Sequence, residues 1–178
     1  KDCESGENNY ENWLANNTFA SDISLSALRG ARLSLASLTN NVKVIEKMWS
    51  HWKVQDSLLE GKMVWDETAP NGFDIVVGNP PWEKLKLSRH EFLKSNGKDR
   101  HYGEEYSQYS SEDFLSEKKA ISDYQQLLFS KYSLIKTNEL DLYMAFIELF
   151  DKLAKPNGVV AVFVPAGLIR SQGTKLLR

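Results

Sequence analysis

The sequence has few of the features that mark disulfide-stabilised, membrane-bound or strongly basic proteins. Its 178 residues include one cysteine, Cys3, which excludes an intrachain disulfide and leads us to expect a reducing, cytoplasmic environment. It has no apolar run of membrane-spanning length and no signal peptide. Its 22 basic and 24 acidic residues give a formal net charge of −2, so no overall positive field favours nucleic acid. Affinity for DNA would need local patches or a further domain.

The sequence also lacks the residue patterns of two common kinds of catalytic site, metal centres and nucleophilic triads. The three histidines are scattered, and no His, Cys, Asp or Glu cluster has metal-ligand spacing, so no metal is expected. No serine lies in a Gly-x-Ser-x-Gly context and Cys3 is terminal, which argues against a nucleophilic triad. The length instead fits one globular domain with a substantial core, and 42% hydrophobic and 26% charged residues are ordinary for such a domain.

Both ends of the chain are interpreted as cut, so that the sequence is expected to be a piece of a larger protein. It begins with Lys1 rather than methionine and ends at Arg178, soon after an apolar segment. Four segments are expected: a polar terminus (1–17), central strands (18–82), an insertion of loop and helix (83–136), and a helix, strand and following segment (137–178).

The most informative stretch runs from Phe73 to Trp82 and reads Phe-Asp-Ile-Val-Val-Gly-Asn-Pro-Pro-Trp. Its first half is apolar and β-branched, which is typical of a strand buried on both faces of a parallel sheet. Gly78 lets the backbone turn and approach a ligand closely, and the two prolines end the strand because neither donates a ladder hydrogen bond. Pro80 biases Asn79 toward an extended conformation. We therefore expect a stiff loop at the carboxyl end of a strand, where doubly wound sheets bind ligands.

Asn79, Pro80 and Trp82 suit the chemistry of a planar amino group. The exocyclic amino group of a nucleobase is a poor nucleophile because its lone pair is delocalised into the ring. The Asn79 side-chain oxygen and the Pro80 carbonyl can accept its two hydrogens, while Trp82 stacks on the base and stabilises developing positive charge. The structural alternative is that the prolines only close the strand and Trp82 packs. The apolar strand before them favours the catalytic interpretation.

Asn-Pro-Pro-Trp after this strand resembles the catalytic motif of the S-adenosylmethionine (SAM)-dependent DNA methyltransferases that act on amino groups. It is most similar to the adenine-N6 enzymes of Eco57I-type restriction systems, and the resemblance covers about Phe19 to Leu177. It implies an α/β fold, namely a Rossmann-like, doubly wound methyltransferase core that is incomplete at both ends. It implies SAM as cofactor and methylation of adenine N6 in DNA, with the target base flipped out of the duplex. The catalytic residues it implies are Asn79, Pro80, Pro81 and Trp82.

The resemblance also implies partners. Double-stranded DNA would be read by a recognition domain outside this sequence, a nuclease domain or subunit would accompany the methylase, and no membrane would be involved. Two alternatives stay open. The same motif serves enzymes that methylate RNA or a glutamine amide of a protein, because these substrates share the planar amino group. A catalytically inactive methyltransferase-like scaffold is the other alternative.

Two aspartates precede the motif, each at the end of an expected strand. Thr18–Ser21 is a strand candidate that ends at Asp22, and a helix follows with Ser24 as its N-cap. An acidic residue in such a turn is well placed to accept hydrogen bonds from ribose hydroxyls. By the resemblance Asp22 holds the ribose of SAM, and Asp56, in Asp-Ser-Leu-Leu, accepts from its adenine amino group. Helix capping is the alternative for both.

The glycine loop that would hold the methionine end of SAM is not intact. The nearest candidate, Asp2 to Gly6, resembles the family's Asp-Pro-x-Cys-Gly-Ser-Gly only in fragments, and Glu4 stands where a glycine is needed. The better interpretation of residues 1–17 is a frayed or truncated terminus. Val42 to Trp49 is expected to extend into a linker, and Gly61 to Gly72 to form a surface turn.

After the motif, residues 83–136 are charged and end in a helical pattern over Phe114 to Tyr132. Within them, Lys94 to Tyr102 mixes basic residues with an aromatic. It can touch DNA phosphates or close over the flipped base, and a solvated connection is the alternative.

A further helix is predicted over Glu139–Ala154, stopped by Lys155–Gly158, with a second fully buried strand at Val159–Val164. This helix carries Asp-Leu-Tyr-x-x-Phe, which is similar to the family's pattern before its fifth strand. By that analogy Phe146 contacts the adenine of SAM, with a core phenylalanine as the alternative. The cofactor-binding set implied by the resemblance is Asp22, Asp56, Asn79 and Phe146.

Overall fold

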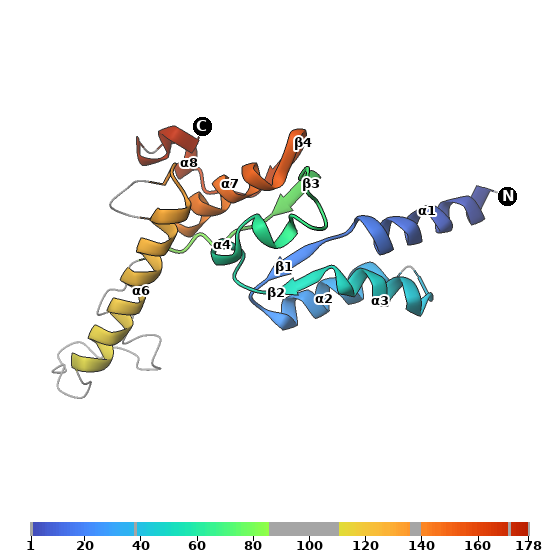
Figure 1. Cartoon of the computed structure of the whole chain (residues 1–178), viewed down its shortest axis with the longest axis horizontal. Coiled ribbons are helices and arrows are strands. Elements are labelled where there is room, and N and C mark those ends of the chain that lie inside the picture. Colours follow the sequence, from blue (N-terminus) through green and yellow to red (C-terminus); the bar gives the residue numbers. More distant parts are fainter. Residues whose placement is uncertain (1, 38, 86–110, 136–139, 171, 178) are drawn as a thin grey trace. The chain divides into compact units, whose positions relative to one another are not determined.

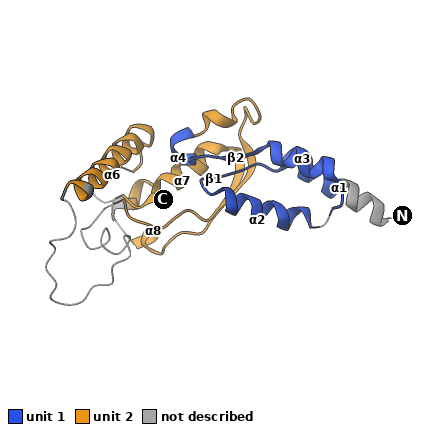
Figure 2. Ribbon diagram, turned by 90° about the horizontal axis from the view of Figure 1, so that it is seen from below, with its two compact units in different colours: residues 1–60 blue, residues 61–178 orange. Residues whose placement is uncertain are grey.

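The computed structural model describes residues 2–37, 39–85, 111–135, 140–170 and 172–177. The chain divides into two compact units, residues 1–60 and 61–178, coloured separately in Figure 2 and described separately below. Each unit contains a two-stranded parallel sheet, β1–β2 in the first and β3–β4 in the second (Figure 1). Helices with parallel strands are compatible with the predicted α/β class. Among the described helices, none is both long and apolar enough to cross a membrane.

The first unit contains four described helices and a short pair of strands. Its core cluster consists of Leu14, Leu28, Met48 and Trp52, which are all buried. Burying each such side chain stabilises the fold by about 1.5–3 kcal/mol. The elements are α1 (Asp2–Asn17), β1 (Ala20–Asp22), α2 (Leu25–Ala36), α3 (Val42–Ser50), β2 (Trp52–Val54) and α4 (Ser57–Glu60).

Two predictions for this unit are wrong. Residues 2–17 are not a frayed terminus but helix α1, because Leu14 and Ala15 are buried and α1 packs beside α3. The candidate glycine loop, Asp2 to Gly6, is therefore helical backbone. Val42 to Trp49 is not a linker but most of helix α3, whose Met48 is buried in the core. Ser24 does cap α2 as predicted, since its Oγ accepts the Ala27 N–H at 3.2 Å.

The second unit is built around helix α7 and the β3–β4 pair. Its elements are the 3₁₀ helix η1 (Met63–Trp65), β3 (Phe73–Gly78), α6 (Ser111–Lys131), α7 (Leu142–Leu153), β4 (Ala154–Val162), α8 (Gly167–Arg170) and the 3₁₀ helix η2 (Gln172–Leu177). The strand before the motif, the helix ending at Tyr132 and the helix after Glu139 are thus confirmed within a few residues. The stretch 61–72 is more than a turn, because it includes η1 with the buried Trp65.

The β3–β4 pair is covered on one face only, among the residues that the structure describes. Val76 is buried, whereas Ile75 and Val77 are 64% and 72% exposed, so the prediction of a strand buried on both faces is wrong. The same prediction fails for the second strand, where Val159 is 57% exposed. Helix α7 contacts both strands, and the Phe150 ring lies against Gly78, so α7 is the element that covers the buried face.

Strand β4 begins earlier than predicted, directly after α7. Phe73 pairs with Ala154 and Ile75 with Val159, so Lys155–Gly158 is accommodated as an irregularity in the ladder. Gly72 faces this irregularity with φ +85°, and a Cβ there would lie 2.8 Å from the Leu153 carbonyl oxygen. A side chain at this position would therefore meet both backbone strain and a steric clash.

Candidate functional site

The carboxyl ends of β1 and β2 bring the two predicted aspartates to one edge. Asp22 pairs in register with Val54, and the Gln55 N–H donates to the Asp22 carbonyl at 3.0 Å. The hydroxyls of Ser21 and Ser57, which flank the aspartates in sequence, are 2.7 Å apart. The expectation that Asp22 and Asp56 each stand at the end of a strand is confirmed, and the structure shows that the two strands are paired.

Both aspartates also make the capping bonds of the structural alternative. Asp22 Oδ1 accepts the Ser24 N–H at 2.7 Å. Asp56 Oδ1 accepts the N–H groups of Leu58 at 2.9 Å and Leu59 at 3.2 Å. These bonds orient each carboxylate toward the turn that follows it.

The donors and acceptors at this edge fit the adenosine part of SAM. Ribose hydroxyls and an adenine amino group need acceptors, which carboxylates supply. Ring nitrogens of adenine need donors, and Gln55 stands between the two strand ends. Its Nε2 is buried and has no hydrogen-bond partner among the described residues. An orphaned buried donor beside two oriented carboxylates is consistent with a polar ligand at this edge.

The four residues of the predicted catalytic motif follow β3 directly, and we call Asn79–Trp82 the motif loop. Asn79 and Pro81 are exposed, Pro80 is buried, and Trp82 is 54% exposed. The Trp82 indole N–H donates to the Phe163 carbonyl at 3.4 Å, and the Phe163 N–H donates to the Gly78 carbonyl at 3.2 Å. The loop is thus attached to the end of β4, with the amide and the indole accessible from solvent.

Gly78 makes a contact that the sequence did not predict, and the close approach of a ligand there stays a prediction. A Cβ at this position would lie 2.5 Å from Phe150 Cζ, so the missing side chain makes room for an aromatic ring of α7. No bound ligand is needed to explain the glycine. Helix α7 therefore packs against the chain at the residue immediately before Asn79.

The chain after the motif loop is held by the start of the same helix. Lys84 and Asp141 form an antiparallel bridge, with Leu85 N–H donating to Leu140 O at 2.8 Å and Leu142 N–H donating to Glu83 O at 3.0 Å. Together with the contact at Gly78, α7 supports the motif loop on both sides. This support preorganises a loop whose Asn79 and Trp82 side chains are exposed.

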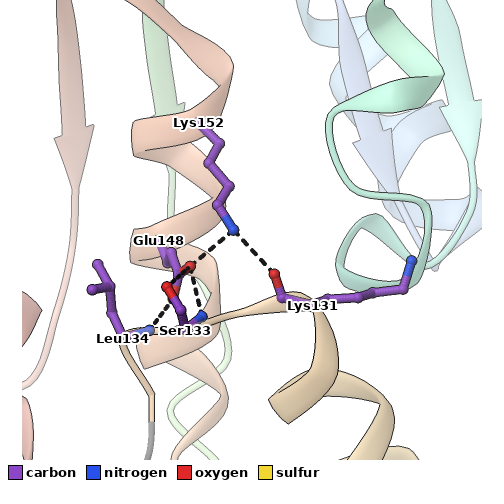
Figure 3. Close-up of polar contacts among 5 residues, drawn as sticks. All are labelled: Lys131, Ser133, Leu134, Glu148 and Lys152. Atoms are coloured by element: carbon purple, nitrogen blue, oxygen red, sulfur yellow. Dashed lines mark hydrogen bonds and ion pairs between the residues drawn. The ribbon is translucent and has the colours of Figure 1, made fainter.

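Helix α7 also holds the chain that follows α6, through the buried carboxylate of Glu148 (Figure 3). This carboxylate accepts the N–H groups of Ser133 at 2.9 Å and Leu134 at 2.8 Å. Lys152, one turn further along α7, pairs with Glu148 at 2.8 Å and donates to the Lys131 carbonyl at 3.1 Å. Burial alone would raise the pKa of Glu148, but the bonds from Lys152, Leu134 and Ser133 outweigh it and hold the pKa below its usual value.

The sequence matches the family described as Eco57I restriction-modification methylase over residues 16–178. The chain belongs to the Eco57I restriction-modification methylase family. Neither a curated protein nor a solved structure matches it significantly. The matched region contains both strand pairs and the motif loop.

The structure of this methylase places the predicted site residues in two groups. Asp22 and Asp56 lie together in the first unit, and Asn79, Pro80, Pro81 and Trp82 lie in the second. Phe146 is on α7, half-buried, with its ring centroid 5.8 Å from that of Phe150. This packing is what the core alternative for Phe146 expects, and its contact with SAM stays a prediction. Lys94 to Tyr102 lies outside the described residues.

Sequence reasoning missed three residues of the methylase that the structure brings to the motif loop or its support. Phe150 fills the space beside Gly78, Glu148 holds the chain after α6, and Phe163 lies beside Trp82. For Phe163 a signal existed, because the ends of two parallel strands meet at one edge. Among the described residues no group of three or more His, Cys, Asp or Glu could hold a metal ion.

Proposed function

We propose that this methylase transfers a methyl group from SAM to the amino nitrogen, N6, of adenine in DNA. The observation that carries the proposal is the motif loop in a member of the Eco57I restriction-modification methylase family, with Asn79 and Trp82 exposed at the carboxyl end of a parallel strand. Asn79 supplies a side-chain oxygen that accepts one amino hydrogen, and the Pro80 carbonyl accepts the other. With both hydrogens held, the nitrogen lone pair is drawn out of conjugation with the ring.

Bound SAM supplies an electrophilic methyl group, and the residues of the chain supply orientation and charge stabilisation. Trp82 stacks on the flipped base and stabilises the positive charge that develops on it. Asp22 and Asp56 hold the ribose and the adenine of the cofactor, and Gln55 offers a donor at the same edge. No strong base is required before the transfer, so catalysis is mainly positioning.

The proposed fold of the whole core is Rossmann-like and doubly wound. Its support is the parallel pairing of both strand pairs and the position of the candidate residues at the carboxyl ends. Double-stranded DNA is the proposed partner, read by a recognition domain outside this sequence. A nuclease, in the same polypeptide or in a partner subunit, is proposed to complete the restriction system.

The test is methylation of unmethylated bacteriophage DNA by the full-length protein with radiolabelled SAM, followed by nucleoside analysis of the digested product. We expect N6-methyladenine from the wild type, and a loss of about 10²–10³-fold in kcat for Asn79→Ala with SAM affinity within a few fold of wild type. Asn71→Ala, which removes an exposed amide before β3, is the matched control.

Other outcomes would assign the motif differently. If the radiolabel were transferred to RNA or to a glutamine peptide and not to DNA, the substrate would be the amino group of that other molecule. SAM binding by calorimetry without transfer to any of the three substrates would favour the inactive scaffold. Near-wild-type activity of Asn79→Ala would reject the motif loop as the catalytic site.

A further inference from the structure

We propose that Phe163 is a second aromatic contact for the target nucleobase, beside Trp82 at the carboxyl end of the β3–β4 pair. This inference rests on the proposed function and deepens it, because it names a residue that receives the methyl acceptor. Neither the motif nor the resemblance assigns a role to Phe163.

The ladder between β3 and β4 brings Phe163 to the level of the motif loop. Gly78 pairs in register with Val162, and the Phe163 N–H continues the ladder to the Gly78 carbonyl at 3.2 Å. One step further along both strands, Asn79 and Phe163 follow these paired residues. Phe163 therefore stands next to the residue that is proposed to hold the amino group.

The alternation of side chains places Phe163 on the open face of the strand pair. Gly78 faces Phe150 of α7, and residues one position away on a strand point to the opposite face. Val77, Val159 and Phe163 are 72%, 57% and 75% exposed, which agrees with this alternation. Phe163 is thus directed away from the helix that supports the loop.

Phe163 and Trp82 are joined to each other, so they are more than two unrelated exposed aromatics. The Trp82 indole N–H donates to the backbone carbonyl of Phe163 at 3.4 Å, and the Trp82 ring is itself 54% exposed. Single exposed apolar residues are common on protein surfaces, but two aromatics held at one strand end make a platform for stacking. The contact places the indole beside the backbone of residue 163.

The chemistry of this edge fits a neutral, flat heterocycle. Asn79 offers an amide, and the two aromatic rings offer π-faces, on which any base can stack. The charged side chains of the two strands, Asp74 and Lys155, pair with each other near the opposite, amino ends of the strands. A purine base with an exocyclic amino group would use the amide and both rings.

The test compares Phe163→Leu with Phe163→Tyr in the full-length protein, using unmethylated bacteriophage DNA as the probe. Leucine keeps an apolar side chain but removes the π-face, whereas tyrosine keeps the face. We expect Phe163→Leu to raise the KM for DNA about tenfold or more, with the KM for SAM within twofold of wild type. We expect Phe163→Tyr to stay close to wild type in both constants.

The matched control is Val159→Ala, which truncates an exposed apolar residue on the same face of β4, earlier along the strand and away from the motif loop. It should leave both KM values unchanged, and melting temperatures of all variants show whether they fold. Once the methylated adenine has been mapped, 2-aminopurine at that position gives a second readout. Its emission in the complex should be brighter with Phe163→Leu than with wild type, because stacking on aromatic rings quenches it.

Three results would overturn the inference. A Phe163→Leu variant within twofold of wild type for DNA would show that the ring does not touch the base. A rise confined to the KM for SAM would assign Phe163 to the cofactor, and Phe163→Tyr as impaired as Phe163→Leu would reject stacking. If wild type is active and Asn79→Ala is not, these results leave the proposed function standing. A wild-type protein that methylates no DNA would contradict both this inference and the proposed function.

Discussion

At the carboxyl end of β1–β2, Asp22 and Asp56 accept N–H groups from the turns that follow them, whereas at the carboxyl end of β3–β4 the Asn79 and Trp82 side chains are exposed. The first edge is oriented by its own local backbone. The second is supported from behind, by α7 at Gly78 and at Glu83. The capping bonds at the first edge and the contacts with α7 at the second both fix polar groups before a ligand binds. This lowers the entropic cost of ordering those groups on binding.

The two supports differ in what they depend on. A capping aspartate needs only the residues next to it in sequence, so it survives changes elsewhere in the unit. The motif loop depends on side chains of α7 that are distant in sequence. Substitutions should therefore act locally at the first edge and through α7 at the second, and the following variants are arranged from the largest expected effect to the smallest.

Glu148→Ala should lower the free energy of unfolding of the second unit by about 3 kcal/mol. It leaves the N–H groups of Ser133 and Leu134 without the buried carboxylate that accepts them, and Lys152 without its partner. Urea unfolding measures the effect, and Asp151→Ala, at an exposed carboxylate of the same helix, is the control. Equal stability of the two variants would show that the carboxylate does not hold the chain after α6.

The contribution of Glu148 should also depend on pH. Because its pKa is lowered in the folded protein, its stabilisation is fully present above the ordinary glutamate value of 4.5. It is lost as the pH falls through the lowered pKa. The difference in stability between wild type and Glu148→Gln should thus be constant at neutral pH and shrink below about pH 4.5. A difference that does not change down to the acid transition would contradict the assigned pKa.

Gly78→Ala should destabilise the second unit by about 2 kcal/mol, because the new Cβ would overlap the Phe150 ring. Gly30 of α2 is the matched glycine in the first unit. An added methyl group there would have nothing within 4 Å, so Gly30→Ala should stabilise by up to about 1 kcal/mol. Thermal unfolding of both variants shows whether each substitution lowers or raises stability. Rescue of Gly78→Ala by Phe150→Leu would identify the ring as the cause, and failure of rescue would point elsewhere.

Asp56→Asn separates capping from cofactor binding at the first edge. Asparagine caps about as well as aspartate, so stability should change by only a few tenths of a kcal/mol, whereas Asp56→Ala should cost about 1 kcal/mol. The amide replaces one acceptor oxygen with a donor, so SAM affinity measured by calorimetry should fall for both variants. Unchanged affinity with a loss of stability only in Asp56→Ala would leave capping as the sole role.

Trp82→Phe should have the smallest effect, within about twofold in the KM for DNA, because any aromatic face can stack on a base. It removes the long indole bond to Phe163, which at 3.4 Å contributes little. Trp82→Ala removes the face itself and should weaken DNA binding more strongly. If phenylalanine were as damaging as alanine, the indole bond would matter rather than the stacking.

Local signals predicted the parts of the fold that depend on neighbours in sequence. Two prolines end β3 and leave Asn79 in a loop, and Ser24 begins α2 through its own hydroxyl. Each aspartate stands at the end of a short strand and caps the next turn. These features require no knowledge of what packs against them, which is why the strand ends and the candidate residues on them were predictable.

The remaining features were decided by tertiary packing. The polar segment 2–17 is a helix because Leu14 and Ala15 find a partner in α3, and a frayed end would leave them in water. Whether a β-branched strand is buried on one face or two depends on where helices lie, and in the described residues α7 covers only one face of β3–β4.

The sequence by itself determined which residues end the strands and which chemistry they carry, because those choices are made by adjacent backbone and side-chain groups. Only the tertiary structure decided that Gly78 is there for Phe150, that Glu148 holds the chain after α6, and that Phe163 stands beside Trp82. These are contacts between residues far apart in the chain, and their register is set by packing rather than by local preference.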